Sequence, residues 1–175
     1  MPSGTGSTHY PEHVPDSIQL RLLRETDIRS LAALYRAAAQ ITGAACYSNE
    51  QTRQWARHTE NLGLFARAVS AGHTLVAEWK GTLAAFGQLN PPDHIAYLYT
   101  DPEFSRKGCA SALCDALERK SWDRGLRHVR TEATRLSRGL FEKKGFQVQE
   151  SEHVLLEEGV LFERFRMLKR VASPP

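Results

Sequence analysis

The sequence predicts a single α/β domain in which helices flank a mixed central sheet. Three observations lead to this fold class. The chain has 175 residues, 41% of them hydrophobic, which suits one domain with a substantial core. Three consecutive strand patterns joined by short turns predict an antiparallel meander. A helical pattern between two later strands predicts a parallel pair, so the sheet should contain both orientations.

The first part of the chain is predicted to form one strand followed by three helices. Ile18 to Leu23 alternates between apolar and polar residues, which predicts a strand. Apolar residues at helical spacing then predict helices over residues 27–40, 49–58 and 61–71. Thr26 or Asp27 is expected to cap the first helix, and Ser48 with Gln51 forms a capping-box pattern before the second.

The second part begins with the meander. Strands are expected over residues 73–79, 82–89 and 94–100, with turns at Lys80-Gly81 and at Asn90 to Asp93. After them we expect a helix over 107–123, a strand over 127–134, a helix over 136–144, and strands over 146–150 and 160–168. A polar arm over 151–159 should join the last two strands. The expected boundaries are a disordered tail over 1–17, the domain over 18–169 and a C-terminal tail over 170–175.

Composition excludes several classes of protein. The formal charge is only +3, which does not favour nucleic acid as a partner. The three cysteines, Cys46, Cys109 and Cys114, have no metal-ligand spacing and are odd in number, so we expect neither a metal site nor a disulfide framework. No run approaches the roughly 20 apolar residues of a membrane-spanning helix. The cytoplasm is therefore the expected location.

The stretch Tyr97 to Glu118 (YLYTDPEFSRKGCASALCDALE) carries the strongest functional signal. An aromatic strand pattern stops at Asp101-Pro102, and a short basic loop leads into a helix that opens with small residues. Unpaired N–H groups and the dipole at a helix N-terminus favour an anion. The pattern therefore predicts a phosphate site at the end of a strand, although a basic turn before a helix is the simpler alternative.

Two motifs in this sequence resemble those of the GCN5-related N-acetyltransferases (GNATs). DPEFSRKGCASAL is similar to the acyl-CoA loop of that family, with Gly108 and Ala110 at the two small positions and Ser105 where the family has Gln or Arg. LFEKKGF, from Leu140 to Phe146, resembles a second motif near the C-terminus of the family. The order of elements over residues 18–169 is also the one that the resemblance implies, with a splayed pair of parallel strands.

The resemblance implies an enzyme that moves acetyl from acetyl-CoA to a primary amine by direct attack in a ternary complex. The acceptor would be a small-molecule or peptide amine, no metal or membrane would be needed, and a homodimer stays open. The main chain of Leu98, Tyr99 and Thr100 would pair with pantetheine. The pyrophosphate would be bound by backbone N–H groups of Arg106, Lys107, Gly108, Cys109, Ala110 and Ser111.

Each candidate for a catalytic role also has a second interpretation. His94 is expected on the same strand face as Ala96 and Leu98, so it is a possible general base, or else a structural residue beside Asp93. Phe141 stands where many GNATs have the tyrosine that protonates the thiolate, and it has no proton to give. Tyr97 or Tyr99 could replace it, or both could pack in the core. Thr134 occupies a position where the family commonly has Asn, and its hydroxyl could contact the cofactor together with Phe141.

Three residues are candidates for the acceptor site. Glu132, near the end of a strand, could bind a substrate ammonium group or be solvated surface. Tyr47 and Trp55 lie in the first helical region, which forms one wall of the acceptor cleft in the family, or they belong to the core. Cys109 is expected to be a protonated thiol at a helix start rather than a nucleophile.

Two rival functions remain at this point. One is a GNAT-like module that binds or senses acyl-CoA without turnover, which the residues at Ser105 and Phe141 leave open. The other is a basic nucleic-acid binder, suggested by the SRKG and RHVR clusters, although no helix-turn-helix spacing supports it. The identity of the acceptor does not follow from the sequence.

Overall fold

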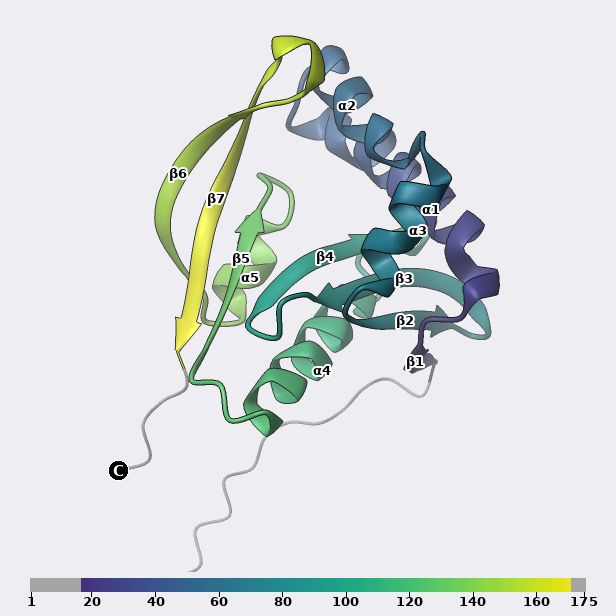
Figure 1. The fold of residues 1–175 in the computed structure, drawn as a ribbon, viewed down its shortest axis with the longest axis vertical. Helices are drawn as coiled ribbons and strands as arrows, with labels where there is room; N and C mark the ends of the chain where they lie inside the picture. Colours follow the sequence, from purple (N-terminus) through teal and green to yellow (C-terminus); the bar gives the residue numbers. More distant parts are fainter. Residues whose placement is uncertain (1–16, 171–175) are drawn as a thin grey trace, which may run out of the picture.

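The structure is a computed structural model that describes residues 17–170. Within this range seven strands form one sheet in the order β1-β2-β3-β4-β5-β7-β6 (Figure 1). The strands are β1 (Ile18–Leu22), β2 (His73–Trp79), β3 (Thr82–Leu89), β4 (His94–Thr100), β5 (His128–Ala133), β6 (Gln147–Leu155) and β7 (Leu161–Arg170). Neighbouring strands are antiparallel except β4 and β5, which are parallel. The predicted mixed α/β sheet is therefore confirmed.

Helices cover both faces of the sheet (Figure 1). One face of the β2–β4 region carries the N-terminal helices α1 (Ile28–Ala37), α2 (Asn49–Ala56) and α3 (Leu62–Ser70). The opposite face carries α4 (Cys109–Asp123) and the short α5 (Arg138–Lys143). A π-helical turn (Ala38–Thr42) extends α1, and 3-10 turns occupy Glu25–Asp27, Gly43–Ala45, Arg57–Thr59, Pro102–Phe104 and Glu157–Gly159.

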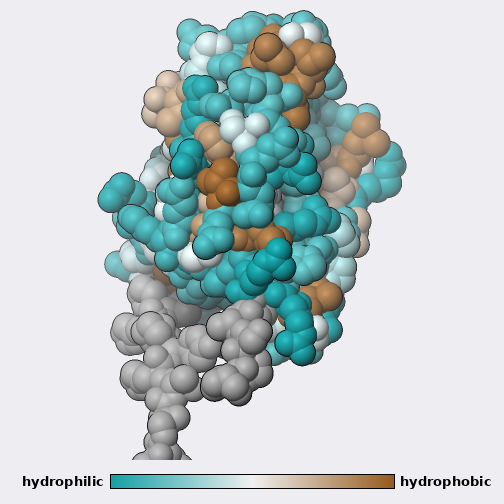
Figure 2. Space-filling view, turned by 90° about the vertical axis from the view of Figure 1, so that its left-hand side faces the viewer, coloured by the Kyte–Doolittle hydropathy of each residue, from teal (hydrophilic) through white to brown (hydrophobic). Residues whose placement is uncertain are grey.

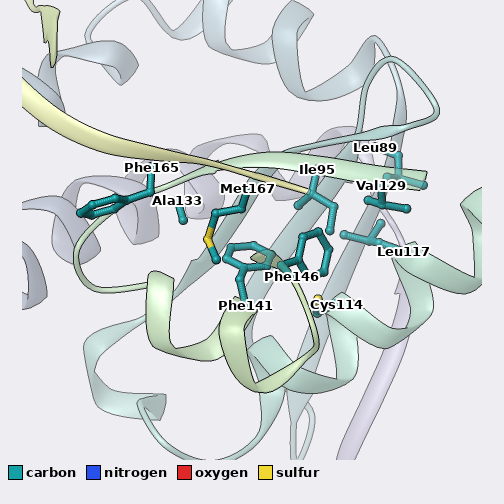
Figure 3. Packing of buried hydrophobic residues seen from close by; sticks show 10 residues of the cluster. All are labelled: Leu89, Ile95, Cys114, Leu117, Val129, Ala133, Phe141, Phe146, Phe165 and Met167. Carbon is teal, nitrogen blue, oxygen red and sulfur yellow. The ribbon is translucent and has the colours of Figure 1, made fainter. Parts of the chain in front are cut away.

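The core between α4, α5 and the sheet is built from ten buried side chains (Figure 3). Phe141 of α5 and Phe146 after it meet edge to face, with ring centroids 5.1 Å apart. Leu117 and Cys114 of α4 reach the same cluster, whereas Phe165 and Met167 come from β7. Burying a side chain of this size is worth about 1.5–3 kcal/mol. The cluster thus fixes α5 against the strands that follow the parallel pair.

The parallel pair is short, and this shapes the site. His94 lies opposite Arg130 and Ile95 opposite Thr131, and β4 and β5 then part. The Thr131 hydroxyl donates to the Ile95 carbonyl oxygen at 2.9 Å, where the strands separate. On the other side of β4, the register with β3 shifts at Ala96, which is a β-bulge. The splayed pair is a feature that the resemblance implied.

Most predicted elements are confirmed within one or two residues, and the predicted cap of the first helix is confirmed only in its position. Asp27 occupies the N-cap position of α1, but its side chain makes no capping hydrogen bond, because its carboxylate accepts from the N–H group of Arg24 at 2.8 Å and pairs with Arg21 at 2.7 Å. Thr26 does not cap it either, since the residue at the N-cap position is Asp27. The capping box of Ser48 and Gln51, by contrast, is present as predicted.

The polar arm over 151–159 was also predicted wrongly for its first half. Strand β6 continues to Leu155 and pairs with β7 up to Leu161. Ser151 and Glu152 give no strand signal because this part of β6 is largely exposed. The apolar alternation that marks a strand with one buried face is therefore missing.

The tip of the β6–β7 hairpin docks on α2. The Glu158 carboxylate accepts from Arg57 at 2.6 Å, from Arg53 at 3.1 Å and from Gln54. Figure 2 shows a mostly hydrophilic surface on the β6 side, with a hydrophobic patch at the top, the end where the β6–β7 connection lies in Figure 1.

Within residues 17–170, no helix is both long and apolar enough to cross a membrane. The expected tails, 1–17 and 170–175, lie outside the described residues except for Ser17 and Arg170, and Arg170 is the last residue of β7.

Candidate active site

A cavity of about 770 Å³ opens where β4 and β5 part. It begins at the N-terminus of α4, passes the exposed edge of β4 and reaches α2 and the π-helical turn after α1. Side chains and backbone from several elements line it, including residues from α5 and β5. The cavity therefore joins the predicted phosphate site to the predicted acceptor side in one continuous space.

The loop before α4 forms one end of the cavity. Arg106 and Gly108 have left-handed backbone, with φ values of 62° and 88°. Turns of this kind bring successive N–H groups to one side, and the helix dipole adds positive potential there. Among the described residues, no acceptor outside α4 takes the N–H groups of residues 106–111. They are available to an anion.

Two cations accompany these N–H groups. Arg106 and Lys143 both line the cavity, whereas the Lys107 ammonium lies 5.3 Å from the centroid of the Trp79 ring and does not line it. Lys143 was missed by the sequence analysis, since nothing in the local pattern of α5 says that this helix faces the start of α4. Cys109 is buried here, and burial raises the pKa of its thiol, so it is a packed, protonated residue.

The edge of β4 runs along the middle of the cavity. Leu98, Tyr99 and Thr100 all line it. Their antiparallel partners are on β3, and the parallel contact with β5 has ended before them. Backbone groups on that side therefore face the cavity, where an extended ligand with amide groups can pair with them.

Glu132 is the first residue of β5 beyond the parallel contact, and it lines the cavity. Its Oε2 lies 2.6 Å from Nε2 of His94. The hydrogen bond from His94 is the main cause that holds the pKa of the Glu132 carboxyl below its usual value, and partial burial opposes it. A carboxylate therefore stands, ionised at neutral pH, where the strands open.

His94 does not occupy the face that we predicted. Ile95 and Leu98 both pack toward α4, so the extra residue at the Ala96 bulge shifts the alternation of β4. His94 lies on the face opposite Leu98, and it lies behind Glu132 instead of lining the cavity. Its Nδ1 lies 3.1 Å from the carbonyl oxygen of Asn90. Both ring nitrogens thus face oxygen atoms, one the Asn90 carbonyl oxygen and the other the Glu132 carboxylate.

Trp55 closes the far end of the cavity and Tyr47 supports it from behind. The Trp55 indole N–H donates to the Tyr99 hydroxyl at 3.2 Å, and its ring lines the cavity. The Tyr47 ring contacts Trp55 at 5.9 Å between centroids but does not line the cavity. Its hydroxyl donates to the Glu163 carbonyl oxygen and accepts from the Arg135 N–H. Of the three predicted acceptor-site residues, the structure brings Trp55 and Glu132 to the cavity and leaves Tyr47 beside it.

Comparison with known proteins identifies the family. A family model described as an acetyltransferase (GNAT) domain matches residues 39–169, most of the chain. The chain belongs to the GCN5-related N-acetyltransferase (GNAT) family. It is accordingly an acyltransferase, and the predicted family and fold are confirmed.

Individual relatives agree with this GNAT assignment. The Escherichia coli (strain K12) protein named uncharacterized N-acetyltransferase YafP is 28% identical over 87% of this chain and 95% of that protein. A crystal structure from Rhodopseudomonas palustris, described as a GCN5-related N-acetyltransferase: aminotransferase, class-II, is 28% identical with a TM-score of 0.86, covering 91% of this chain and 99% of that one. The Thermoplasma acidophilum PaiA N-acetyltransferase, solved with coenzyme A, shares the fold at 24% identity and a TM-score of 0.67, covering 89% and 99% of the chains.

The remaining candidate residues of this GNAT divide by whether they reach the cavity. Phe141 and Thr134 both line it, and the Thr134 hydroxyl lies 3.2 Å from that of Ser137. Tyr99 lines it, and burial raises the pKa of its phenol. Tyr97 does not line it: its hydroxyl lies 2.7 Å from Nε2 of His58, and burial raises its pKa to about 12.

No metal site accompanies the cavity in the described part of the chain. Residues 17–170 contain no group of three or more His, Cys, Asp or Glu side chains arranged to hold a metal ion. The chemistry that this chain offers at the cavity comes from backbone N–H groups, two cations, one carboxylate with its histidine, and aromatic walls.

Proposed function

We propose that this protein transfers an acetyl group from acetyl-CoA to a primary amine by direct attack in a ternary complex. One observation carries the proposal. A single cavity connects the free N–H groups at the start of α4 with the Glu132 carboxylate, through the gap between β4 and β5. A diphosphate and an amine bound at its two ends would leave the thioester between the parted strands.

The donor end has the groups that acetyl-CoA requires. The N–H groups of residues 106–111 would hold the pyrophosphate, with Arg106 and Lys143 adding charge. The exposed main chain of Leu98 to Thr100 would pair with pantetheine, and the Phe141 ring would pack against it. Acetyl-CoA supplies an acetyl group that is activated as a thioester. The task of this chain is to fix that group in line with the amine.

At the acceptor end, Glu132 would bind the amine and accept its proton, and His94 would position the Glu132 carboxylate. The ionised carboxylate attracts the ammonium form and orients the nitrogen after it loses a proton. In the transfer, the nitrogen forms a bond to the carbonyl carbon, the carbon–sulfur bond breaks, and one proton leaves the nitrogen. Glu132 receives that proton directly or through water, with His94 positioning the carboxylate. We therefore keep His94 as a candidate in the proton path, acting through Glu132.

The departing thiolate also needs a proton or a hydrogen bond. Phe141 offers neither, and Tyr97 does not reach the cavity. The Tyr99 hydroxyl accepts from Trp55 and also interacts with the Tyr35 side chain, and its own hydrogen would turn toward the sulfur. Because burial raises its pKa, the phenol stays neutral and is a weak acid. We propose that Tyr99 donates a hydrogen bond to the sulfur and that water in the cavity delivers the proton.

The proposal is tested by measuring binding and turnover side by side. Calorimetry with acetyl-CoA should show saturable binding, and release of free thiol over a panel of primary amines should show turnover with at least one amine. Binding without thiol release for every amine would instead favour a GNAT-fold module that senses acyl-CoA.

We also propose a cytoplasmic location, because all three cysteines are free thiols.

A further inference from the structure

The charges that line the cavity are distributed unevenly. Three charged residues line it: Arg106 and Lys143 near the start of α4, and Glu132 at the opposite end. Both cations thus lie at the end proposed for the diphosphate. The acceptor end offers one negative group, and its other lining residues are uncharged: Ala38, Thr42, Trp55, Tyr99 and Thr134.

The guanidinium groups near Glu132 are already engaged. Arg130 lies on the same face of β5, with its Nη1 4.0 Å from Glu132, but its Nε is bound by Asp93 at 3.1 Å. Arg135 is held by Glu163 at 2.6 Å and by the Cys46 carbonyl oxygen. Arg164 is held by Glu152 at 2.5 Å. None of the three arginines lines the cavity.

The wall opposite this carboxylate is a fixed aromatic surface. The Trp55 ring contacts Phe162 at 5.3 Å and Tyr99 at 6.0 Å between centroids. Behind it, Tyr47 stacks on Phe162 at 4.3 Å with the rings 13° from parallel. Gly43 lies so close that a Cβ atom there would come within 3.1 Å of the indole. Trp55 therefore has little freedom to move away from a bound molecule.

We infer that the acceptor is a cationic amine with a hydrophobic carbon body and no carboxylate beside its nitrogen. This inference rests on the proposed function. The ammonium group would meet Glu132 and the carbon body would lie on Trp55, which makes Trp55 the residue that determines specificity. An α-carboxylate would be placed next to Glu132 with no free cation at that end of the cavity to receive it, so the partly buried carboxylate of Glu132 repels amino acids.

Pairs of compounds that differ only by a carboxylate give a direct test. Thiol release should be measured with phenethylamine against phenylalanine, and with isoamylamine against leucine, at saturating acetyl-CoA. We expect kcat/KM to be at least tenfold higher for the amine of each pair. In Glu132→Gln, where overall turnover is lower, the ratio should shrink because the repelling charge is gone.

Variants at the wall test the role of Trp55. Trp55→Ala should raise KM for phenethylamine at least tenfold, and Trp55→Phe should restore most of the loss because it keeps a ring. Gly43→Ala should push the indole a few tenths of an ångström into the cavity and raise KM for phenethylamine more than KM for ethylamine. Gly63→Ala is the matched control, since a Cβ atom there makes only an ordinary contact with Asn61. Acetyl-CoA binding should be unchanged in all of these variants.

The outcomes separate this inference from the reaction on which it rests. Thiol release with amino acids at the same kcat/KM as with their matched amines would overturn the inference and leave the transferase intact. Equal KM values for wild type and Trp55→Ala would remove Trp55 as the determinant of specificity. Saturable acetyl-CoA binding with no thiol release for any amine would overturn both the reaction and the inference.

Discussion

The two ends of the cavity present different kinds of chemical group. The donor end presents backbone N–H groups from one loop, so a few neighbouring residues define it. The acceptor end presents side chains from α2, β4 and β5, which are far apart in the sequence and meet only in the folded protein. The first end is the one proposed to hold acetyl-CoA, whereas the second can be altered one side chain at a time.

The contrast predicts different responses to mutation. A change in the acceptor side chains should affect turnover and leave binding of the donor unchanged. A change in the donor loop should affect binding of acetyl-CoA first. Each prediction below would sharpen this division or break it, from the largest expected effect to the smallest.

Glu132→Gln should cause the largest loss. The side chain keeps its size but can no longer attract the ammonium group or take its proton, and positioned bases of this kind contribute about 100-fold or more. We expect kcat/KM for the amine to fall about 100-fold while the Kd for acetyl-CoA stays the same. Glu142→Gln, at an exposed carboxylate on α5, is the control and should keep full activity. If Glu132→Gln weakened acetyl-CoA binding instead, the two ends would not be separable.

Gly108→Val should weaken acetyl-CoA binding more than tenfold, about 1.4 kcal/mol. Valine at a φ of 88° strains the loop and moves the N–H groups away from the diphosphate. Calorimetry gives the Kd. Gly125→Val is a matched control, because Gly125 also has a left-handed φ, 78°, and lies beyond the C-terminus of α4. Similar Kd values for both variants would show that backbone strain alone, and not the loop, is responsible.

His94→Leu should lower kcat/KM by about tenfold and change its pH dependence. The hydrogen bond from His94 is the main cause that lowers the pKa of Glu132, so its removal should raise that pKa. In the wild type the Glu132 carboxylate becomes protonated only as the pH falls through its lowered pKa. In the variant this protonation begins at a higher pH. The ratio of variant to wild-type kcat/KM should therefore decrease as the pH is lowered from about 7 to 5.

The control for the His94 variant is His153→Leu, at an exposed position on β6. It should leave the ratio flat over the same pH range. A flat ratio for His94→Leu as well would mean that the His94–Glu132 contact does not tune the carboxylate, and His94 would then be a structural residue.

Tyr47→Phe should have the smallest effect on function and a measurable one on stability. The hydroxyl satisfies the Glu163 carbonyl oxygen and the Arg135 N–H group, which link the helical wall to β7 and to the segment after β5. Its loss should lower the free energy of unfolding by about 1–2 kcal/mol. Denaturant unfolding measures this. An unchanged free energy of unfolding would show that water replaces the hydroxyl.

The same contrast explains which features the sequence could predict. The donor loop, the meander and α4 follow from local patterns, and their bounds are nearly those of the structure. The contact between His94 and Glu132 could not be predicted, because it depends on the parallel register and on the Ala96 bulge that reverses the face of His94. Lys143 was missed for a related reason. It lines the cavity only because Phe141 packs α5 against the sheet. Strand β6 was cut short because its exposed half has no buried face to impose a pattern.

The brevity of the parallel contact also has a dynamic consequence. Two residue pairs join β1–β4 to β5–β7 within the sheet, so the β4 amides that face the gap have no strand partner to slow their exchange with solvent deuterium. A pantetheine arm lying in the gap would act as a surrogate strand and protect them. The donor would then be part of the sheet while it is bound, and each turnover would complete the sheet and dismantle it again.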